Sequence, residues 1–286
     1  MASNKTVRVL VAAIGIPVAA AVIYAGSWVL VAMLAVLGVG GTIELYRMAR
    51  QAGLRPLAWP GITGAALLPL GAFAALPAGG AVAPRWLVFA VAAWLVLTVS
   101  IGTFTRGTAD RPLASVAVTL FGAVYAGGLP AFLLPIRHAP DLSSALAASA
   151  LVLLPLVTTW VCDSVAMEVG TRVGGPKLAP VLSPKKTWSG AVGGSLGAVV
   201  AAPLYGALLL ARVDVTIPLW QLALFGLVVS AVGQIGDVSE SLFKREVGIK
   251  DSGTFFPGHG GVLDRLDSLY WVLPTAALLL ALFGIV

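Results

Sequence analysis

Long stretches without a charged residue limit what this chain can fold into more than any other feature of its sequence. A helix needs about 20 apolar residues to cross ~30 Å of hydrocarbon, and residues 112–136 and 187–211 each exceed that length without a charge. Charged residues make up only 10% of the 286 residues, whereas water-soluble chains carry about 25%. The mean hydropathy of +0.98 agrees, so we predict an integral membrane protein.

The apolar stretches predict an all-α, polytopic membrane protein with about nine transmembrane helices. The sequence lacks the alternating ~10-residue segments of a membrane β-barrel, so helices are the remaining way to satisfy the backbone in lipid. The first stretch, residues 9–43, is too long for one crossing and is interrupted at Gly26 and Ser27, so it predicts two spans. The other predicted spans are residues 57–76, 86–104, 112–136, 142–162, 187–211, 216–236 and 268–286.

The distribution of lysine and arginine predicts the orientation, because cytoplasmic loops carry an excess of these residues. With the N-terminus in the cytoplasm and the C-terminus outside, only Arg85, Arg137 and Arg212 of the 18 Lys and Arg residues lie on the outer side of the cell (inner) membrane. Anionic lipid headgroups explain the net charge of +6, since most cations flank spans. We therefore expect membrane lipids, and no nucleic acid, as partners. The oligomeric state stays open, a homodimer included.

The two halves of the chain differ in their loops. We predict that residues 1–142 form a scaffold of transmembrane helices and residues 143–286 a catalytic half, within a single integrated domain. Glu44 in the first half is explained by an i, i+3 pairing with Arg47. The second half has two long polar loops, residues 163–186 and 239–267. The predicted topology places both on the cytoplasmic side, which favours one site assembled from two loops.

The first polar loop contains LAPVLSPKKTWSG, residues 178–190. Ser183 is a good helix N-cap and Pro184 suits the first helical position, so a helix is predicted to begin there. Lys185, Lys186 and Thr187 would surround its free amides, an arrangement suited to phosphate. A lysine pair at the inner end of a span is explained equally well by topology, and this segment alone leaves both interpretations open.

The second polar loop begins with a helical face. Gln234, Asp237, Ser241 and Lys244 recur at helical spacing. A carboxylate such as Asp237 near the lipid boundary is costly unless it faces a polar cavity, a cation or a metal, and a salt bridge to a lysine is the structural alternative.

The rest of this loop, KDSGTFFPGHGGVLDRLD, begins at Lys250 and Asp251. Its glycines include Gly258, Gly260 and Gly261, which allow close approach of the backbone to a ligand. His259, between glycines, is interpreted as a hydrogen-bond donor to phosphate or as a structural residue.

Asp264 and Asp267 lie three residues apart at the predicted start of the last helix, where they would share a face. Asp237 and Asp264 could converge on magnesium, which prefers carboxylate oxygens and keeps phosphate in its shell. The single cysteine, Cys162, excludes a disulfide framework and a multi-cysteine metal site. Carboxylates for a metal, lysines and arginines for the remaining charge, and glycines for close contact are what phosphoryl transfer uses.

These residues match the pattern of a known family. From Ser241 to Asp267 the sequence reads S-x-x-K-R-x4-K-D-S-G-x3-P-G-H-G-G-x-x-D-R-x-D, which resembles the defining pattern of phosphatidate cytidylyltransferases, also called CDP-diacylglycerol synthases. The blocks GQIGD and KLAPVLSPKKTW agree with it. The similarity is strong over residues 160–268, whereas the first half agrees only in hydropathy.

The resemblance implies that CTP and phosphatidate are the substrates and that CDP-diacylglycerol and pyrophosphate are the products. It implies a magnesium ion held by Asp237 and Asp264, and it alone suggests a potassium ion beside it. The residues assigned to catalysis are Asp237, Asp264, Lys244, Arg245, Lys250, Asp251, His259, Arg265 and Asp267. The residues assigned to substrate binding are Ser183, Lys185, Lys186, Thr187, Asp163, Gln234, Ser241, Gly260 and Gly261.

The chain departs from the family pattern in two places. The family has D-x-x-A-Y followed by G-R, whereas here Met167 stands in place of the tyrosine and Thr171 separates Gly170 from Arg172. After KKTW the family has a glutamate, and here Ser189 stands there. These departures concern nucleotide contacts and leave the predicted metal and phosphate residues intact.

Two other functions are compatible with a polytopic scaffold. A CTP-dependent kinase of an isoprenoid alcohol would also need phosphate-binding loops, but it would release CDP instead of pyrophosphate. A transporter of an anionic solute is expected to have broken helices at the midplane in matching halves. The two long charged loops of this chain lie in one half and on one predicted face, which favours the cytidylyltransferase.

Overall fold

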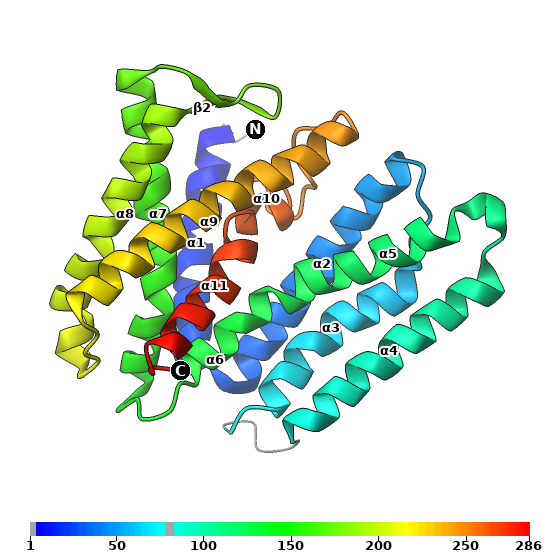
Figure 1. The fold of residues 1–286 in the computed structure, drawn as a ribbon, viewed down its shortest axis with the longest axis horizontal. Helices are drawn as coiled ribbons and strands as arrows, with labels where there is room; N and C mark the ends of the chain where they lie inside the picture. The colour runs from blue at the N-terminus through cyan, green and yellow to red at the C-terminus, as the bar shows by residue number, and fades with distance from the viewer. Residues whose placement is uncertain (1–3, 78–82) are drawn as a thin grey trace. The chain divides into compact units, whose positions relative to one another are not determined.

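The computed structural model describes residues 4–77 and 83–286, and it is helical apart from one small hairpin (Figure 1). The prediction of an all-α polytopic protein is confirmed. Two shorter apolar helices, Val9–Ala25 and Ala58–Ala74, accompany the longer ones and match two further predicted spans. Within the described residues, the helices long and apolar enough to cross a membrane are Ser27–Gln51, Arg85–Thr105, Pro112–Arg137, Ala145–Val173, Trp188–Val213, Leu219–Glu246 and Leu263–Leu282.

The chain divides into two compact units, each discontinuous in sequence. The first comprises Met1–Leu134 and Glu246–Leu266, and the second comprises Pro135–Arg245 and Asp267–Val286. The glycine-rich loop, residues 247–262, therefore packs with the N-terminal helices.

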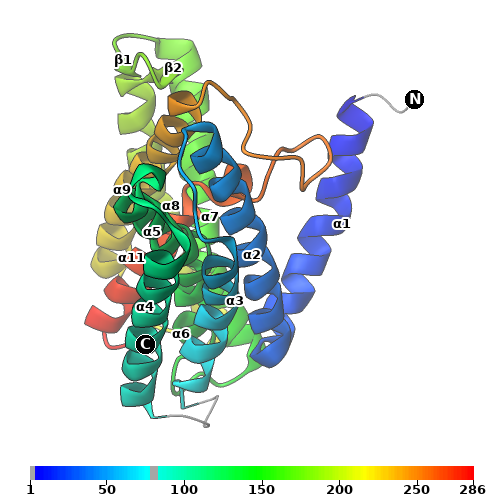
Figure 2. The same cartoon turned by 90° about the vertical axis from the view of Figure 1, so that its right-hand side faces the viewer.

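In the first unit the helices between Ser27 and Ala123 lie side by side, whereas the first helix leans away from them (Figures 1 and 2). Gly26 (φ 59°) and Ser27 (φ 46°) separate its first two helices, which confirms the predicted interruption there. Tyr46 lies fully buried among the helices and donates a hydrogen bond to the Thr119 carbonyl at 2.6 Å. The helices are α1 (Asn4–Ala25), α2 (Ser27–Gln51), α3 (Ala58–Ala74), α4 (Pro84–Thr105), α5 (Pro112–Ala123) and the short α10 (Leu263–Leu266).

The second unit contains the hairpin and the longest helices. In it α7 and α8 approach each other closely. A Cβ built on Gly190 of α8 would lie only 2.6 Å from the Ala166 carbonyl oxygen of α7. The short α6 (Leu133–Arg137) joins the two units along the chain. The elements of the second unit are α7 (Ala145–Val173), β1 (Lys177–Ala179), β2 (Ser183–Thr187), α8 (Trp188–Leu208), α9 (Leu219–Glu246) and α11 (Leu269–Leu282).

The two predicted loops are shorter than the sequence indicated. Helix α7 continues to Val173, so the prediction of a loop from Asp163 is wrong, and Asp163 lies within a helix. An ion pair between Glu168 and Arg172, one turn apart, supports the added turns. Helix α9 likewise continues to Glu246, so the predicted loop 239–267 begins too early.

The start of the last helix also differs. Helix α10 ends at Leu266 and α11 begins at Leu269, with Asp267 and Ser268 in a turn between them. Asp264 and Asp267 therefore do not share one helix face. The Asp267 side chain accepts a hydrogen bond from the Ser268 amide at 2.6 Å, which fixes the turn.

The predicted helix start at Pro184 is wrong. Residues Ser183–Thr187 form β2, which pairs antiparallel with β1, and α8 begins at Trp188. Thr187 is the N-cap, since its Oγ1 accepts a hydrogen bond from the Gly190 amide at 3.1 Å. Strand pairing occupies the backbone groups that a helix beginning at Pro184 would have used. The lysine pair consequently lies on a strand.

Gly194→Val should destabilise the second unit, because its Cβ would lie 2.7 Å from the Cys162 carbonyl oxygen. Overpacking of this kind costs about 1–3 kcal/mol. Thermal unfolding of the purified protein in detergent should show a lower midpoint. Gly15→Val is the matched control, since Gly15 is also helical and has no atom within 4 Å of the added Cβ. Equal midpoints for the two variants would contradict the close approach of α7 and α8.

Candidate active site

A cavity of about 630 Å³ in the second unit gathers many of the predicted site residues. It is walled by α7, the hairpin, α8 and α9. The two departures Met167 and Thr171 also line it. The predicted residues in its wall are Asp163, Ser183, Lys185, Lys186, Thr187, Gln234 and Asp237.

An ion pair joins two sides of this cavity. Lys186 Nζ on β2 lies 2.6 Å from Asp237 Oδ2 on α9, and the two side chains are 25% and 31% exposed. The lysine salt bridge considered from the sequence is thus present. Asp163 and Asp267 lie close enough to interact electrostatically with both Asp237 and Lys186. Three carboxylates around one paired lysine leave a local excess of negative charge, which attracts cations.

Gln234 connects α9 to α8 at the wall of the cavity. Its Nε2 donates hydrogen bonds to the Ala191 carbonyl at 3.3 Å and to Ser195 Oγ at 3.1 Å. The Gln234 side chain is therefore held in place by α8. The helical face predicted from its spacing is present on α9, where both Gln234 and Asp237 line the cavity.

Three other predicted residues of α9 lie outside the cavity wall. Lys244 pairs with the buried Glu240 at 3.2 Å, one turn earlier on the same helix. Arg245 donates through Nε to the Leu182 carbonyl at 3.4 Å, in the turn between β1 and β2. Ser241 is half-buried. Their assigned roles stay predictions.

Asp264 organises the glycine-rich loop in the first unit. Its Oδ2 accepts hydrogen bonds from the Ser252 amide at 2.8 Å, from Ser252 Oγ at 2.9 Å and from the Gly261 amide at 2.8 Å. The carboxylate thereby joins the two ends of the loop. Gly260 has φ of 85°, a conformation that favours glycine, and a Cβ there would lie 2.6 Å from the same carboxylate oxygen.

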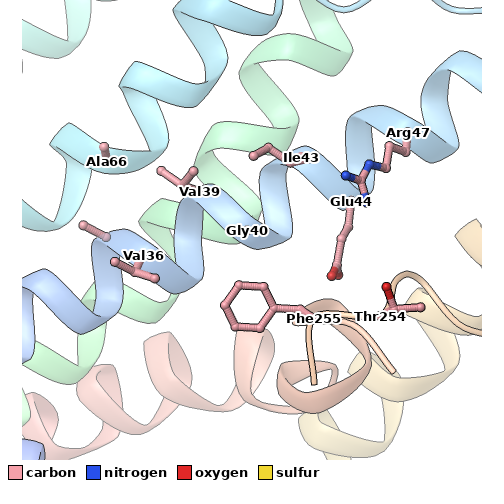
Figure 3. Close-up of a pocket in the computed structure, with 10 residues that line it drawn as sticks. Val36, Val39, Gly40, Ile43, Glu44, Arg47, Ala66, Thr254 and Phe255 are labelled. Carbon is pink, nitrogen blue, oxygen red and sulfur yellow. The ribbon is translucent and has the colours of Figure 1, made fainter. Parts of the chain in front are cut away.

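Glu44 contacts the glycine-rich loop, which the sequence analysis did not predict. It is 3% exposed and accepts hydrogen bonds from the Val262 and Leu263 amides, each at 3.0 Å, and its Oε2 lies 2.9 Å from Ser252 Oγ. Figure 3 shows its carboxylate pointing from α2 toward the loop. The predicted pairing with Arg47 is therefore wrong. An acid inside a membrane span is a functional candidate by default, and that signal could have identified it.

A second cavity, of about 600 Å³, lies in the first unit beside Glu44. Its walls are mainly apolar, with Val36 and Val39 on α2 opposite Phe255 of the loop, and Arg47 lies in the same wall (Figure 3).

The remaining predicted residues of the glycine-rich loop and α10 lie outside both cavity walls. The His259 amide donates to the Phe256 carbonyl at 2.8 Å. Lys250, Asp251 and Arg265 are exposed.

The predicted metal site stays a prediction. Among residues 4–77 and 83–286, no group of three or more His, Cys, Asp or Glu side chains is arranged to hold a metal ion. Asp237 belongs to the second unit and Asp264 to the first.

Glu44→Ala should loosen the glycine-rich loop, because it removes the acceptor for two buried amides. Each amide left without a partner costs about 1–3 kcal/mol. Hydrogen exchange of residues 247–262 should become faster in the purified variant. Glu168→Ala is the control, since Glu168 is exposed and pairs with Arg172 within α7. Unchanged protection of the loop in Glu44→Ala would show that this carboxylate does not anchor it.

Comparisons with known proteins show the family of the chain. The profile of the Cytidylyltransferase family matches residues 6–283. A phosphatidate cytidylyltransferase of Brucella abortus is 50% identical over 125 residues, 44% of this chain and 43% of that protein. One of Staphylococcus saprophyticus is 43% identical over 45% of this chain and 48% of that protein. One of Bacillus subtilis is 34% identical over 85% of this chain and 87% of that protein. The first two alignments thus span less than half the length of those relatives.

Proposed function

Because the chain belongs to the cytidylyltransferase family, we propose that it transfers the cytidylyl group of CTP to phosphatidate. The observation that supports this most directly is the cavity of the second unit. Lys185 and Lys186 meet Asp163 and Asp237 there, and the two carboxylates lie on helices long enough to span a membrane. Such a cavity would offer cations to a polyphosphate and carboxylates to a metal.

The reaction proposed for this site is a displacement at phosphorus. A phosphate oxygen of phosphatidate attacks the α-phosphorus of CTP, the bond from that phosphorus to the β-phosphate oxygen breaks, and pyrophosphate leaves. Phosphatidate is already an anion at neutral pH, since phosphate monoesters have a second pKa near 6. The main obstacle is repulsion between two anions, so positioning and charge neutralisation are the tasks of the protein. Lys185 and Lys186 are the cations of the cavity that are suited to these two tasks.

The donors in the second unit fit a divalent cation. Asp237 offers carboxylate oxygen, and the charges of Asp163 and Asp267 add to the negative potential around it. Magnesium needs only one or two carboxylates, because it retains water and substrate phosphates as ligands. We propose Asp237 as a magnesium ligand. The proposal of Asp264 as the second ligand rests on the sequence pattern and the resemblance, and that of potassium as a neighbouring ion rests on the resemblance alone. Bound magnesium would supply charge neutralisation of the triphosphate.

The cavity is proposed to face the cytoplasm, where CTP is found. The support is the bias of lysine and arginine toward one side of the predicted spans. Lys177 and the lysine pair lie before α8, whereas Arg212 lies after it. The two ends of α8 are therefore expected on opposite sides of the membrane.

Purified protein incubated with CTP labelled at the α-phosphate, phosphatidate and magnesium should move label into the lipid extract and release pyrophosphate. Chelation by EDTA should stop the transfer and added magnesium should restore it. Release of CDP without labelled nucleotide in lipid would instead indicate a kinase and would refute the proposal.

Asp237→Asn should lower turnover by about 10²-fold or more, the typical cost of removing one preorganised charged group from such a site. A second measurement separates metal binding from activity: magnesium should raise the thermal unfolding midpoint of the native protein but not that of the variant. Asp214→Asn is the control, because Asp214 is exposed in a turn after α8 and asparagine tolerates its φ of 57°. Full activity in Asp237→Asn would exclude the assigned role.

Single cysteines at Lys177 and Arg212 test the orientation, since both residues are exposed and the native Cys162 is buried. A membrane-impermeant maleimide added to intact cells should label Arg212→Cys and leave Lys177→Cys unlabelled until the cells are opened. The reverse pattern would turn the cavity to the outside and contradict the proposed access of CTP.

A further inference from the structure

The polar cavity of the second unit continues into an apolar groove. The groove encloses about 660 Å³, and Leu178, Ala191 and Gln234 line both spaces. The cavity and the groove are therefore neighbours with common walls. The cavity carries charged groups, whereas the groove is lined by aliphatic side chains, one tryptophan, two serines and Gln234.

One face of α8 and one face of α9 form the groove. On α8 the lining positions follow the helical repeat: Trp188, Ala191, Val192, Ser195, Leu196 and Val199. On α9 they run from Leu227 to Leu242 in the same manner. Leu196 is 62% exposed and Leu227 49%, so these apolar side chains are not covered by other parts of the structure.

The two serine hydroxyls in the groove wall already have partners. Ser195 Oγ accepts a hydrogen bond from Gln234 Nε2, and Ser239 Oγ donates one to the Ile235 carbonyl at 2.8 Å. An apolar occupant would therefore cover no unpaired polar group of these side chains, and the usual penalty for burying one does not arise.

The length of the groove matches one leaflet of a bilayer. Residues 188–199 of α8 advance by about 1.5 Å each, or about 16 Å in all. The hydrocarbon core is ~30 Å thick, so half of it is about 15 Å. A chain that entered from the end of the cavity would extend to about the middle of the membrane.

We propose that this groove binds one acyl chain of the phosphatidate substrate while the phosphate of the same molecule lies in the polar cavity near Lys185 and Lys186. This inference rests on the proposed function. The apolar cavity beside Glu44 is the competing location, but it shares no lining residue with the cavity that holds the lysine pair. The continuity of cavity and groove favours the groove.

A kinetic experiment tests the groove with Ala231→Phe. Ala231 lines the groove only, is exposed, and leaves room for a larger side chain to block the acyl chain. The KM for dioleoyl phosphatidate should rise about tenfold, whereas the KM for CTP and for dihexanoyl phosphatidate should stay within about twofold of the native protein. Ala207→Phe, at an exposed alanine of α8 outside the groove, should change none of these values. Equal effects on long and short chains, or no effect, would overturn the proposal.

A binding experiment keeps this test independent of turnover. Phosphatidate with a photoreactive diazirine midway along one acyl chain should label α8 and α9 within residues 192–199 and 227–238 of the native protein. Labelling should fall in Ala231→Phe. If the native protein transferred no nucleotide but still labelled these segments, the proposed reaction would fail and the groove would stand. Labelling of residues 35–43 of α2 would place the acyl chain in the cavity beside Glu44 and would refute the proposal that the groove binds it.

Discussion

The cost of placing charge at the edge of the hydrocarbon shapes the site in the second unit. Asp237 lies on a helix that enters the membrane, where an uncompensated carboxylate is expensive, and Lys186 compensates it directly. The hairpin makes this possible, because β2 brings Lys186 to Asp237 on α9 and ends at Thr187. Thr187 then caps α8. One short segment thus supplies both the cation for the site and the start of the next span.

The first unit uses carboxylates, the buried Glu44 and the half-buried Asp264, for a different purpose. Ser252 Oγ lies 2.9 Å from both Glu44 Oε2 and Asp264 Oδ2, although a hydroxyl group carries one hydrogen. The backbone amides of Gly261, Val262 and Leu263 supply the remaining donors. A Cβ at Gly261 would overlap the Glu44 carboxylate and Ser252 Oγ. A side chain at position 261 would therefore displace the carboxylate that orders the loop. This explains the glycine without invoking a ligand that approaches the backbone.

Hydropathy was sufficient to predict the membrane-spanning helices. In lipid the backbone must form its hydrogen bonds within the segment, so a long apolar stretch directly indicates a helix. It failed where charged residues continue a helix beyond the hydrocarbon. The charges at Asp163, Glu168 and Arg172 were interpreted as a loop, yet a helix outside the membrane tolerates charges and these extend α7. The hairpin was missed since Ser183 and Pro184 fit a helix cap locally, and strand pairing outweighed that preference. Glu44 was missed because its partners lie more than 200 residues away, at separations of 208 to 219.

The departures from the family pattern are accommodated by local contacts. Ser189, which stands where the family has a glutamate, donates a hydrogen bond to the Gly174 carbonyl at the end of α7 and lies 3.0 Å from Thr187 Oγ1. It therefore ties the C-terminal end of α7 to the cap of α8, a role that a longer acidic side chain could not fill at the same distance. Met167 and Thr171 lie in the cavity wall itself. Because a thioether is apolar and adaptable, Met167 gives the α7 wall of the cavity a surface suited to packing where the family has a hydrogen-bonding tyrosine.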